Sequence, residues 1–232
     1  MKRFYKEAQV VSVEGDFAVE LDSKPLRTPE KRPLIVPTLK LAEAIADEWR
    51  GQGLTVRPLS LPFTRLVSTA LDRVRPRRAD VIAEIAKYAT TDLLCYRADE
   101  PRELVERQEQ IWQPLLDWVE ARLDASFVVT QGITPLAQTP ATLAAIERAV
   151  AAHDAMQLVA LHLATTACGS VVLGLALLAE RISAEEAFAA AQLDESFQIE
   201  RWGEDAEQTK TRAALKEDIA LAARFAALLR GD

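Results

Sequence analysis

The residues that could carry catalytic or metal chemistry are few and far apart in this chain. The two histidines, His153 and His162, stand nine positions apart, which places them on opposite faces of a helix. The two cysteines, Cys95 and Cys168, have no CxxC partner and are typical of small buried residues in a reducing compartment. The chain also has neither a G-x-S-x-G elbow nor a glycine-rich phosphate loop. We therefore predict no catalytic residues, no metal site and no cofactor.

The most distinctive candidate site is an acidic run around two aromatic residues near the C-terminus. Its members are Asp194, Glu195, Phe197, Glu200, Trp202, Glu204, Asp205 and Glu207. Asp194 precedes Phe197 by three positions and Gln198 by four, so these side chains share a helix face. The run can be a solvated helix face or a docking surface for a basic patch on a partner. General acid/base catalysis is the third alternative, but no pocket chemistry accompanies the carboxylates.

Two further aromatic residues lie in the segment 88–122. Trp112 and Trp118 are six positions apart, so they point to different faces of a helix. Trp118 follows Leu115 by three positions and fits a core position. Trp112 lies beside Gln108 and Gln113, which makes it the better candidate for a surface residue that binds a partner. A structural role for both tryptophans remains open.

The elements that must position these residues begin with a small β unit. Strands are predicted at 8–13 and 17–21, on either side of a short connection containing Gly15 that is typical of a hairpin. A short strand follows at 34–36, and then a helix at 38–52 with Thr38 as its N-cap. We predict a domain 1–62 that is mostly antiparallel β with one helix.

Helical periodicity dominates the rest of the chain. Helices are predicted at 63–74, 77–95, 101–122, 140–152, 154–180, 183–203 and 205–229. Pro76 is expected to interrupt the first of them. The uncharged stretch 158–179 is long enough to span a bilayer, but polar residues within it and acidic residues on both sides favour a buried bundle helix. The prediction is an α+β fold in which the β domain packs on a larger helical domain, 63–232.

Charge and the N-terminal residues restrict the partners and the compartment. The net charge of −7 argues against nucleic acid as a general partner. The charge is uneven: residues 1–74 hold 12 Lys/Arg and 10 Asp/Glu, whereas residues 75–232 hold 16 and 25. The first residues lack the apolar region of a secretory signal and the Arg/Ser-rich amphipathic leader of a mitochondrial precursor. These features predict a bacterial cytoplasmic protein without stable membrane insertion.

Several motifs along the chain occur in an order and spacing that are fairly specific. They are Arg3-Phe4-Tyr5-Lys6, Lys24-Pro25-Leu26-Arg27-Thr28-Pro29, Glu48-Trp49, Thr91-Asp92-Leu93-Leu94-Cys95-Tyr96-Arg97, and Leu193-Asp194-Glu195-Ser196-Phe197-Gln198-Ile199-Glu200-Arg201-Trp202-Gly203. Together they resemble the assembly-chaperone family for the alpha subunit of the F-type ATP synthase catalytic head. The resemblance covers nearly the whole chain.

The resemblance implies a function. A member of this family would bind the unassembled alpha subunit and prevent its aggregation until beta subunits join, without catalysing a reaction and as a monomer when free. The family places its acidic signature in the run that begins at Leu193, although Ser196 stands here where an acid would be unsurprising. The partner-binding residues that we predict are Asp194, Glu195, Phe197, Glu200, Trp202 and Trp112. Eukaryotic relatives would act in the mitochondrial matrix.

Two other functions remain as alternatives. One is a small-molecule enzyme with a pocket between the β and helical domains, lined by Arg65, Arg73, Tyr96 and Glu106. The other is a permanent structural subunit of a larger complex, which would co-purify with the mature assembly in stoichiometric amounts.

Overall fold

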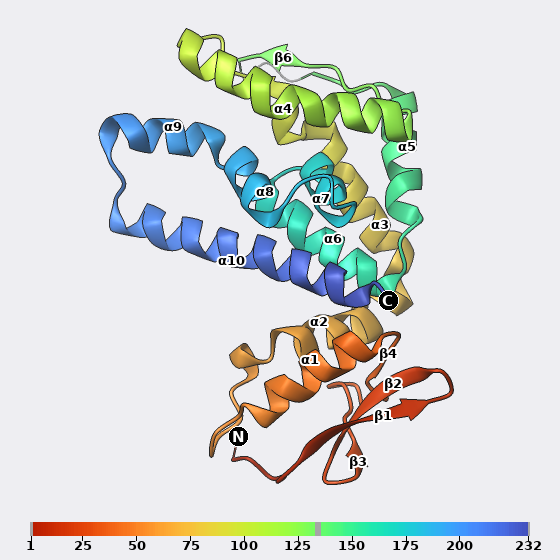
Figure 1. Cartoon of the computed structure of the whole chain (residues 1–232). Coiled ribbons are helices and arrows are strands. Elements are labelled where there is room, and N and C mark those ends of the chain that lie inside the picture. The colour runs from red at the N-terminus through yellow and green to blue at the C-terminus, as the bar shows by residue number, and fades with distance from the viewer. Residues whose placement is uncertain (1, 133–135, 232) are drawn as a thin grey trace. The chain divides into compact units, whose positions relative to one another are not determined.

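The computed structural model describes residues 2–132 and 136–231 of the chain (Figure 1). The predicted α+β class is confirmed, because a small antiparallel sheet lies in the N-terminal part and helices form most of the remainder. The chain divides into two compact units. The first comprises Met1–Arg78, Asp154–Ala160 and Arg224–Asp232, and the second Ala79–His153 and Leu161–Ala223. The domain boundary at residue 62 stays a prediction.

The first unit contains the sheet and two helices from the N-terminal part of the chain. Its elements are β1 (Ala8–Val13), β2 (Asp16–Leu21), β3 (Lys24–Pro25), β4 (Ile35–Val36), α1 (Leu39–Arg50), a 3₁₀ turn (Pro58–Ser60) and α2 (Pro62–Thr69). Strand β2 is central, because β1, β3 and β4 all pair with it in antiparallel orientation.

The predicted hairpin is confirmed. Val10 pairs with Val19, and Val13 pairs with Asp16 across the loop. The two loop residues, Glu14 and Gly15, have φ values of 53° and 94°. Positive φ at both central residues is the twist that a two-residue hairpin loop needs, and glycine adopts it without steric cost.

Helix α1 packs against β1 and β2, and its start and inner face agree with the prediction. The Thr38 hydroxyl oxygen accepts a hydrogen bond from the Leu41 amide at 3.2 Å, as an N-cap should. Trp49, at the end of the buried face, contacts Tyr5 edge to face with ring centroids 5.5 Å apart. Its indole N–H donates to the Thr64 hydroxyl at 3.1 Å, which ties α1 to α2.

The interruption predicted at Pro76 is wrong, because helical turns continue from α2 through this proline. A π turn at Ala70–Val74 and a 3₁₀ turn at Arg75–Arg77 connect α2 to the next helix. In a regular α-helix the proline ring would clash with the carbonyl four residues earlier. A change of helix type before the proline moves that carbonyl away, so the chain accommodates the ring without leaving the helical conformation.

The second unit is built from helices with one short parallel strand pair. The elements that lie in it wholly or in part are α3 (Arg78–Ala86), β5 (Tyr96–Arg97), α4 (Arg102–Leu123), β6 (Thr130–Gln131), α5 (Pro140–Ala151), α6 (Ala155–Cys168), α7 (Val171–Leu178), α8 (Ala184–Ala191), α9 (Leu193–Trp202) and α10 (Ala206–Leu229). Short 3₁₀ turns at Lys87–Thr91 and Leu93–Cys95 connect α3 to β5.

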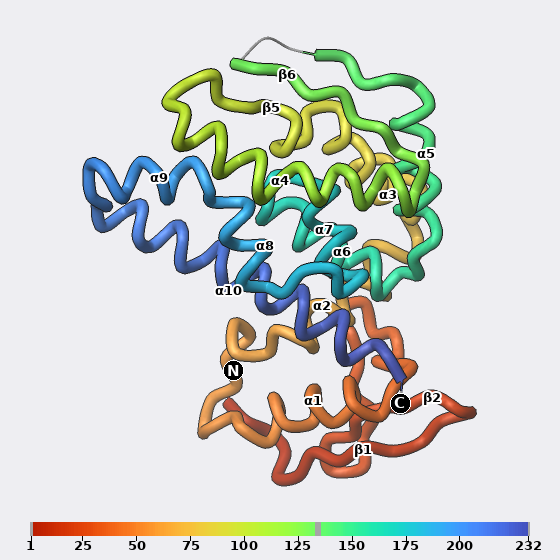
Figure 2. Tube along the Cα trace, turned by 45° about the horizontal axis from the view of Figure 1, so that its top comes forward, coloured from red at the N-terminus to blue at the C-terminus, as the bar shows by residue number. Residues whose placement is uncertain are grey.

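The core of the second unit combines large side chains from α4 with small ones from the other helices. Trp112, Leu116 and Val119 of α4 are buried in one cluster with alanines of α6, α7, α8 and α10. Alanine lets helices approach closely, so the few bulky residues can fill the space between them. In Figure 2, α9 and the beginning of α10 lie side by side in this unit.

Two long helices predicted from the sequence are each divided in the structure. The stretch 154–180 breaks at Gly169–Ser170, where Gly169 has a φ of 64° and Ser170 caps α7. The stretch 183–203 breaks at Gln192, between α8 and α9. Ser183 and Glu186 form a capping box at the start of α8. Among the described residues, no helix combines the length and apolar character needed to cross a membrane.

Candidate partner-binding surface

Helix α9 carries most of the predicted partner-binding residues, and its sequence explains which of them face outward. Leu193 and Phe197 are buried and lie one helical turn apart, so they form the inner stripe. Glu195, Glu200 and Trp202 are exposed on the remaining faces. The helix ends at Gly203, whose φ of 83° turns the chain towards α10.

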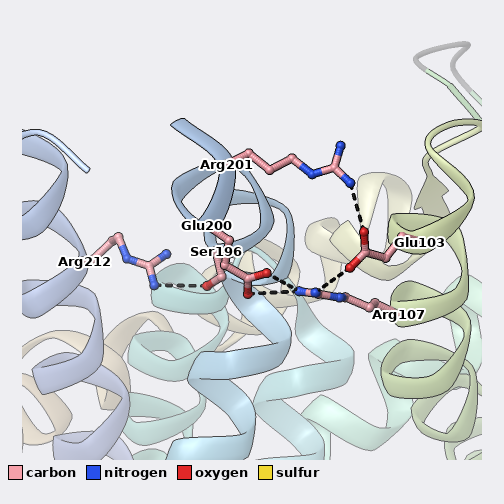
Figure 3. Close-up of polar contacts among 6 residues, drawn as sticks. All are labelled: Glu103, Arg107, Ser196, Glu200, Arg201 and Arg212. Atoms are coloured by element: carbon pink, nitrogen blue, oxygen red, sulfur yellow. Dashed lines mark hydrogen bonds and ion pairs between the residues drawn. The ribbon is translucent and has the colours of Figure 1, made fainter. Parts of the chain in front are cut away.

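An ion-pair network holds α9 to α4 (Figure 3). Arg107 of α4 donates to both carboxylate oxygens of Glu200 at 2.9 and 2.8 Å, and to Glu103 at 2.9 Å. Glu103 also accepts from Arg201 of α9 at 2.9 Å. These two guanidinium groups lower the pKa of Glu103. The network therefore favours the ionised form of Glu103 and fixes the orientation of α9.

The Phe197 ring lies beneath the same two arginines. The guanidinium carbon of Arg201 is 4.1 Å from the ring centroid and that of Arg107 is 5.2 Å from it. Phe197 is itself buried. Its role is to anchor α9 through packing and cation–π contacts, and its ring is not available to a partner in this arrangement.

Asp194 is a structural link between α4 and α9. The buried Gln108 side chain donates to an Asp194 oxygen at 2.7 Å, and its own oxygen accepts from the Ala98 amide at 2.8 Å. Partial burial raises the pKa of Asp194, while the bond from Gln108 acts in the opposite direction. Asp194 thus differs from its exposed neighbour Glu195 in burial and in hydrogen bonding.

The surface position predicted for Trp112 is wrong. Trp112 is fully buried, and its indole N–H donates to the Ala190 carbonyl at 2.9 Å. The preceding residue, Ile111, is 40% exposed. The prediction took the polar neighbours of Trp112 as a sign of exposure. One of these neighbours, Gln108, is itself buried and hydrogen-bonded. Trp118 is half-buried against the core.

A groove of about 380 Å³ lies between α9 and α10. Its lining includes Glu195, Ile199, Trp202, Glu207, Thr211 and Leu215. Arg212 of α10 lines the groove too, where it donates to Ser196 and Gln192 at 3.1 Å each and pairs with Glu204 at 3.2 Å. The positive charge of Arg212 is thus taken up within the protein, and the rim residues Glu195 and Glu207 leave the groove acidic and partly apolar.

Trp202 is the most notable residue of this groove, because its side chain is 77% exposed. A tryptophan exposes a large apolar area to water at a cost in free energy, and such residues frequently dominate binding to protein partners. The site brings Trp202 together with Glu195 on one groove, whereas Asp194, Phe197, Glu200 and Trp112 form the support behind it.

Sequence reasoning missed the residues that hold this surface in place. The Glu103 and Arg107 spacing is a recognisable i, i+4 pair. Nothing in the local sequence, however, pairs Arg107 with Glu200, which is 93 positions away. Arg212 and its bonds to α9 were missed for the same reason.

The two cysteines are buried, as the sequence predicts. Burial raises the pKa of the Cys95 and Cys168 thiols to about 12, with the Asp92 charge contributing, so both are protonated at neutral pH. His162 is half-exposed, with its Nε2 atom 3.9 Å from Glu84. Among the described residues, no three side chains of His, Cys, Asp and Glu are grouped so that they could hold a metal ion.

The four residues proposed to line an enzyme pocket are distributed over both units. Arg65 and Arg73 line one groove in the first unit. Tyr96 lies in β5, and Glu106 lies on α4, where it pairs with Arg102 at 2.6 Å. Both of these belong to the second unit.

The fold and the surface together define an α+β protein that presents an acidic, tryptophan-bearing groove on a helical unit. A model of the family described as ATP12 chaperone protein matches residues 2–120. The chain belongs to the ATP12 chaperone family, a family of ATP synthase assembly chaperones, and the predicted family is thereby confirmed.

Three relatives illustrate the similarity. The crystal structure of Atp12 from Paracoccus denitrificans is 41% identical, has a TM-score of 0.95, and the match covers 99% of this chain and 98% of that one. A variant of that protein, with lysine in place of an aspartate, matches with the same values. Protein atp12, mitochondrial, of Schizosaccharomyces pombe is 28% identical over 221 residues, covering 89% of this chain and 76% of the relative.

Proposed function

We propose that this protein binds the unassembled alpha subunit of ATP synthase and prevents its aggregation until beta subunits join. Family membership and the ordered motifs support an assembly chaperone. An unassembled subunit exposes apolar surface that is buried in the finished complex, and such surface promotes aggregation. A protein that covers it reversibly needs no catalytic turnover. In this proposal the chaperone acts as a monomer in the bacterial cytoplasm.

The observation that carries the proposed binding site is the exposed Trp202 beside the acidic groove between α9 and α10. An aromatic anchor flanked by carboxylates complements an apolar side chain flanked by lysine or arginine. We assign direct contact with the client to Trp202 and Glu195, while Glu200 supports α9 through its pair with Arg107. Asp194, Phe197 and Trp112 act indirectly, because they position α9 and the neighbouring α8.

A substitution at Trp202 tests the proposal. Trp202→Ala should weaken binding of free alpha subunit by about tenfold or more, the typical effect of removing an interface tryptophan. Because the side chain is largely exposed, the free energy of unfolding should change by less than about 0.5 kcal/mol. Affinity is measured by calorimetry, and aggregation of the alpha subunit during mild heating is followed by light scattering.

Two controls make the result interpretable. Ile111→Ala shortens another exposed apolar side chain of the same unit and should leave binding unchanged. Free beta subunit replaces alpha in a parallel titration and should bind far more weakly. If the wild-type protein neither binds alpha subunit nor reduces its aggregation, the proposed function is wrong. If it binds alpha but Trp202→Ala binds equally well, only the proposed surface is wrong.

A further inference from the structure

A second groove, of about 580 Å³, lies in the first unit between α2 with its following π turn and the loop after β3. Trp49, Pro58 and Leu61 contribute apolar lining, and Arg27, Arg65 and Arg73 contribute positive charge. Trp49 and Leu61 are buried, so they form a floor, whereas the three arginines are exposed. The groove therefore combines an apolar base with cationic edges.

The carboxylates of this groove are already engaged within the protein. Asp72 accepts from the Thr28 hydroxyl at 2.8 Å and from the Glu30 amide at 3.1 Å, and lies 3.6 Å from Arg32. Glu30 pairs with the same Arg32 at 3.5 Å. Neither carboxylate neutralises the arginines that line the groove.

The arginines that line the groove, by contrast, have N–H donors that are free to bind a ligand. Arg27 donates one N–H to the Lys31 carbonyl at 2.8 Å, which leaves its charge uncompensated. Within the described parts of the chain, the guanidinium groups of Arg65 and Arg73 have no hydrogen-bond acceptor or ion-pair partner. In the second unit, Arg102, Arg107 and Arg201 of the helices are paired with glutamates. The groove thus gathers three arginine side chains that, among the described residues, have no carboxylate partner.

The local sequence reinforces the positive potential. From Arg57 to Arg78 the chain has six arginines and one acidic residue, Asp72, although the whole protein carries a net charge of −7. Such a local excess of one charge attracts groups of opposite charge. The overall negative charge, on the other hand, repels extended polyanions such as nucleic acids and anionic membranes. A short acidic segment of a protein satisfies both conditions.

The spacing of the arginines indicates how the acidic groups must be arranged. Arg65 and Arg73 are eight positions apart, which is about 12 Å along a helix. A single small anion contacts one such position at a time, whereas carboxylates about four residues apart in an extended chain are separated by about 13 Å. We propose that this groove binds an acidic protein segment whose Asp or Glu side chains pair with Arg65 and Arg73, with apolar residues between them on the Trp49 and Leu61 floor.

A labelled peptide tests the inference, independently of any binding of the alpha subunit. The probe is a fluorescein-labelled peptide of three Ser-Glu-Leu-Pro repeats, and the matched control peptide has Gln in place of every Glu. Fluorescence anisotropy with the full-length protein should give saturable binding of the Glu peptide and none of the Gln peptide. Arg65→Gln combined with Arg73→Gln should weaken binding by about tenfold or more, because two charge-assisted hydrogen-bonding groups are removed.

The matched protein control is Arg122→Gln combined with Arg148→Gln. Both arginines are exposed in the second unit, so the net charge changes equally while the groove is intact, and the affinity should stay within about twofold. Equal loss in both double variants would mean a non-specific charge effect and would overturn the proposal. So would equal binding of the two peptides. Displacement of the Glu peptide by millimolar inorganic phosphate, or tighter binding to phosphatidylglycerol vesicles, would assign the groove to phosphate groups instead.

Discussion

Asp92 is the ionisable residue with the most unusual environment in this protein. It is fully buried in the second unit and accepts hydrogen bonds from the Ser170 hydroxyl at 2.7 Å and from the Leu94 and Val172 amides at 3.2 Å each. Burial raises its pKa from 3.8 to about 6, although these donors act in the opposite direction. Its carboxylate therefore caps two helical segments, Leu93–Cys95 and α7, at an electrostatic cost.

The raised pKa of Asp92 predicts a defined pH dependence of stability. Between about pH 4 and pH 6 Asp92 holds a proton in the folded state that it has released in the unfolded state, so the contribution of Asp92 to the free energy of unfolding falls as pH rises and levels off above pH 6. The expected size is about 3 kcal/mol, from a shift of about two pH units. Asp92→Asn cannot titrate and should lack this decline.

Urea unfolding of the wild-type protein and Asp92→Asn at a series of pH values provides the measurement. The difference between their free energies of unfolding isolates Asp92, because every other titrating group is shared. A difference that stays constant from pH 4 to pH 6 would show that the pKa of Asp92 is close to its ordinary value. The absolute stability of the variant does not enter this comparison.

At the scale of elements, local signals were predictable and long-range ones were not. The hairpin at Glu14-Gly15, the N-cap Thr38 and the capping box of Ser183 with Glu186 each depend on residues within a few positions of one another. The division between α6 and α7 has a local signal, Gly169 followed by the N-cap Ser170, which the prediction of one continuous helix overlooked. The hydrogen bond from Ser170 to Asp92, 78 positions earlier in the chain, could not be predicted from the local sequence.

The candidate surface shows the same limit. Its acidic and aromatic residues could be identified from the sequence, and the exposed position of Trp202 agrees with a docking role. The sequence did not show which of these residues hold α9 in place instead of facing a partner. That distinction depends on contacts with Gln108, Arg107 and Arg212 from other helices. Trp112 was assigned to the surface because its neighbours are polar, yet one of those neighbours is buried beside it.

The contact of α6 with α7 depends on a glycine. A Cβ atom added at Gly174 would lie 2.5 Å from the Thr165 hydroxyl oxygen, which is buried without a hydrogen-bond partner among the described residues. Gly169, between the same two helices, serves the turn instead, because nothing lies within 4 Å of its added Cβ and its φ is 64°. Gly174 is therefore the position at which packing would be most sensitive to a methyl group.

A double-mutant cycle checks this contact. Gly174→Ala should lower the free energy of unfolding by about 1–3 kcal/mol through overpacking, whereas Thr165→Ala should cost less than about 1.5 kcal/mol, because the lost hydroxyl was unsatisfied. The double variant should be more stable than the sum of the single effects by about 1 kcal/mol or more. Gly53→Ala, with open space around the added methyl, is the neutral control. Strict additivity in urea unfolding would contradict a steric clash between the two positions.

For the whole molecule, the uneven charge gives the two grooves opposite characters. The groove between α9 and α10 has free carboxylates at its rim, whereas the groove beside α2 has free guanidinium groups. A surface that carries charges of one sign attracts partners of the opposite charge and repels partners of the same charge. The two grooves would therefore recognise different segments, whether these belong to one client or to separate proteins.

Hydrogen exchange on the whole chain can establish which surface the alpha subunit covers. If α9 and α10 form the binding site, adding free alpha subunit should slow exchange of the backbone amides in α9 and in the first half of α10, since binding reduces local opening and excludes water. Helix α5, which contributes nothing to the lining of that groove, is the internal reference and should exchange at an unchanged rate. Repeating the measurement with Trp202→Ala, at a concentration where the wild-type protein is saturated, should remove most of the protection. Protection confined to α5 or to β1 and β2 would place the client elsewhere, because amides far from a contact are slowed only when the whole protein becomes more stable.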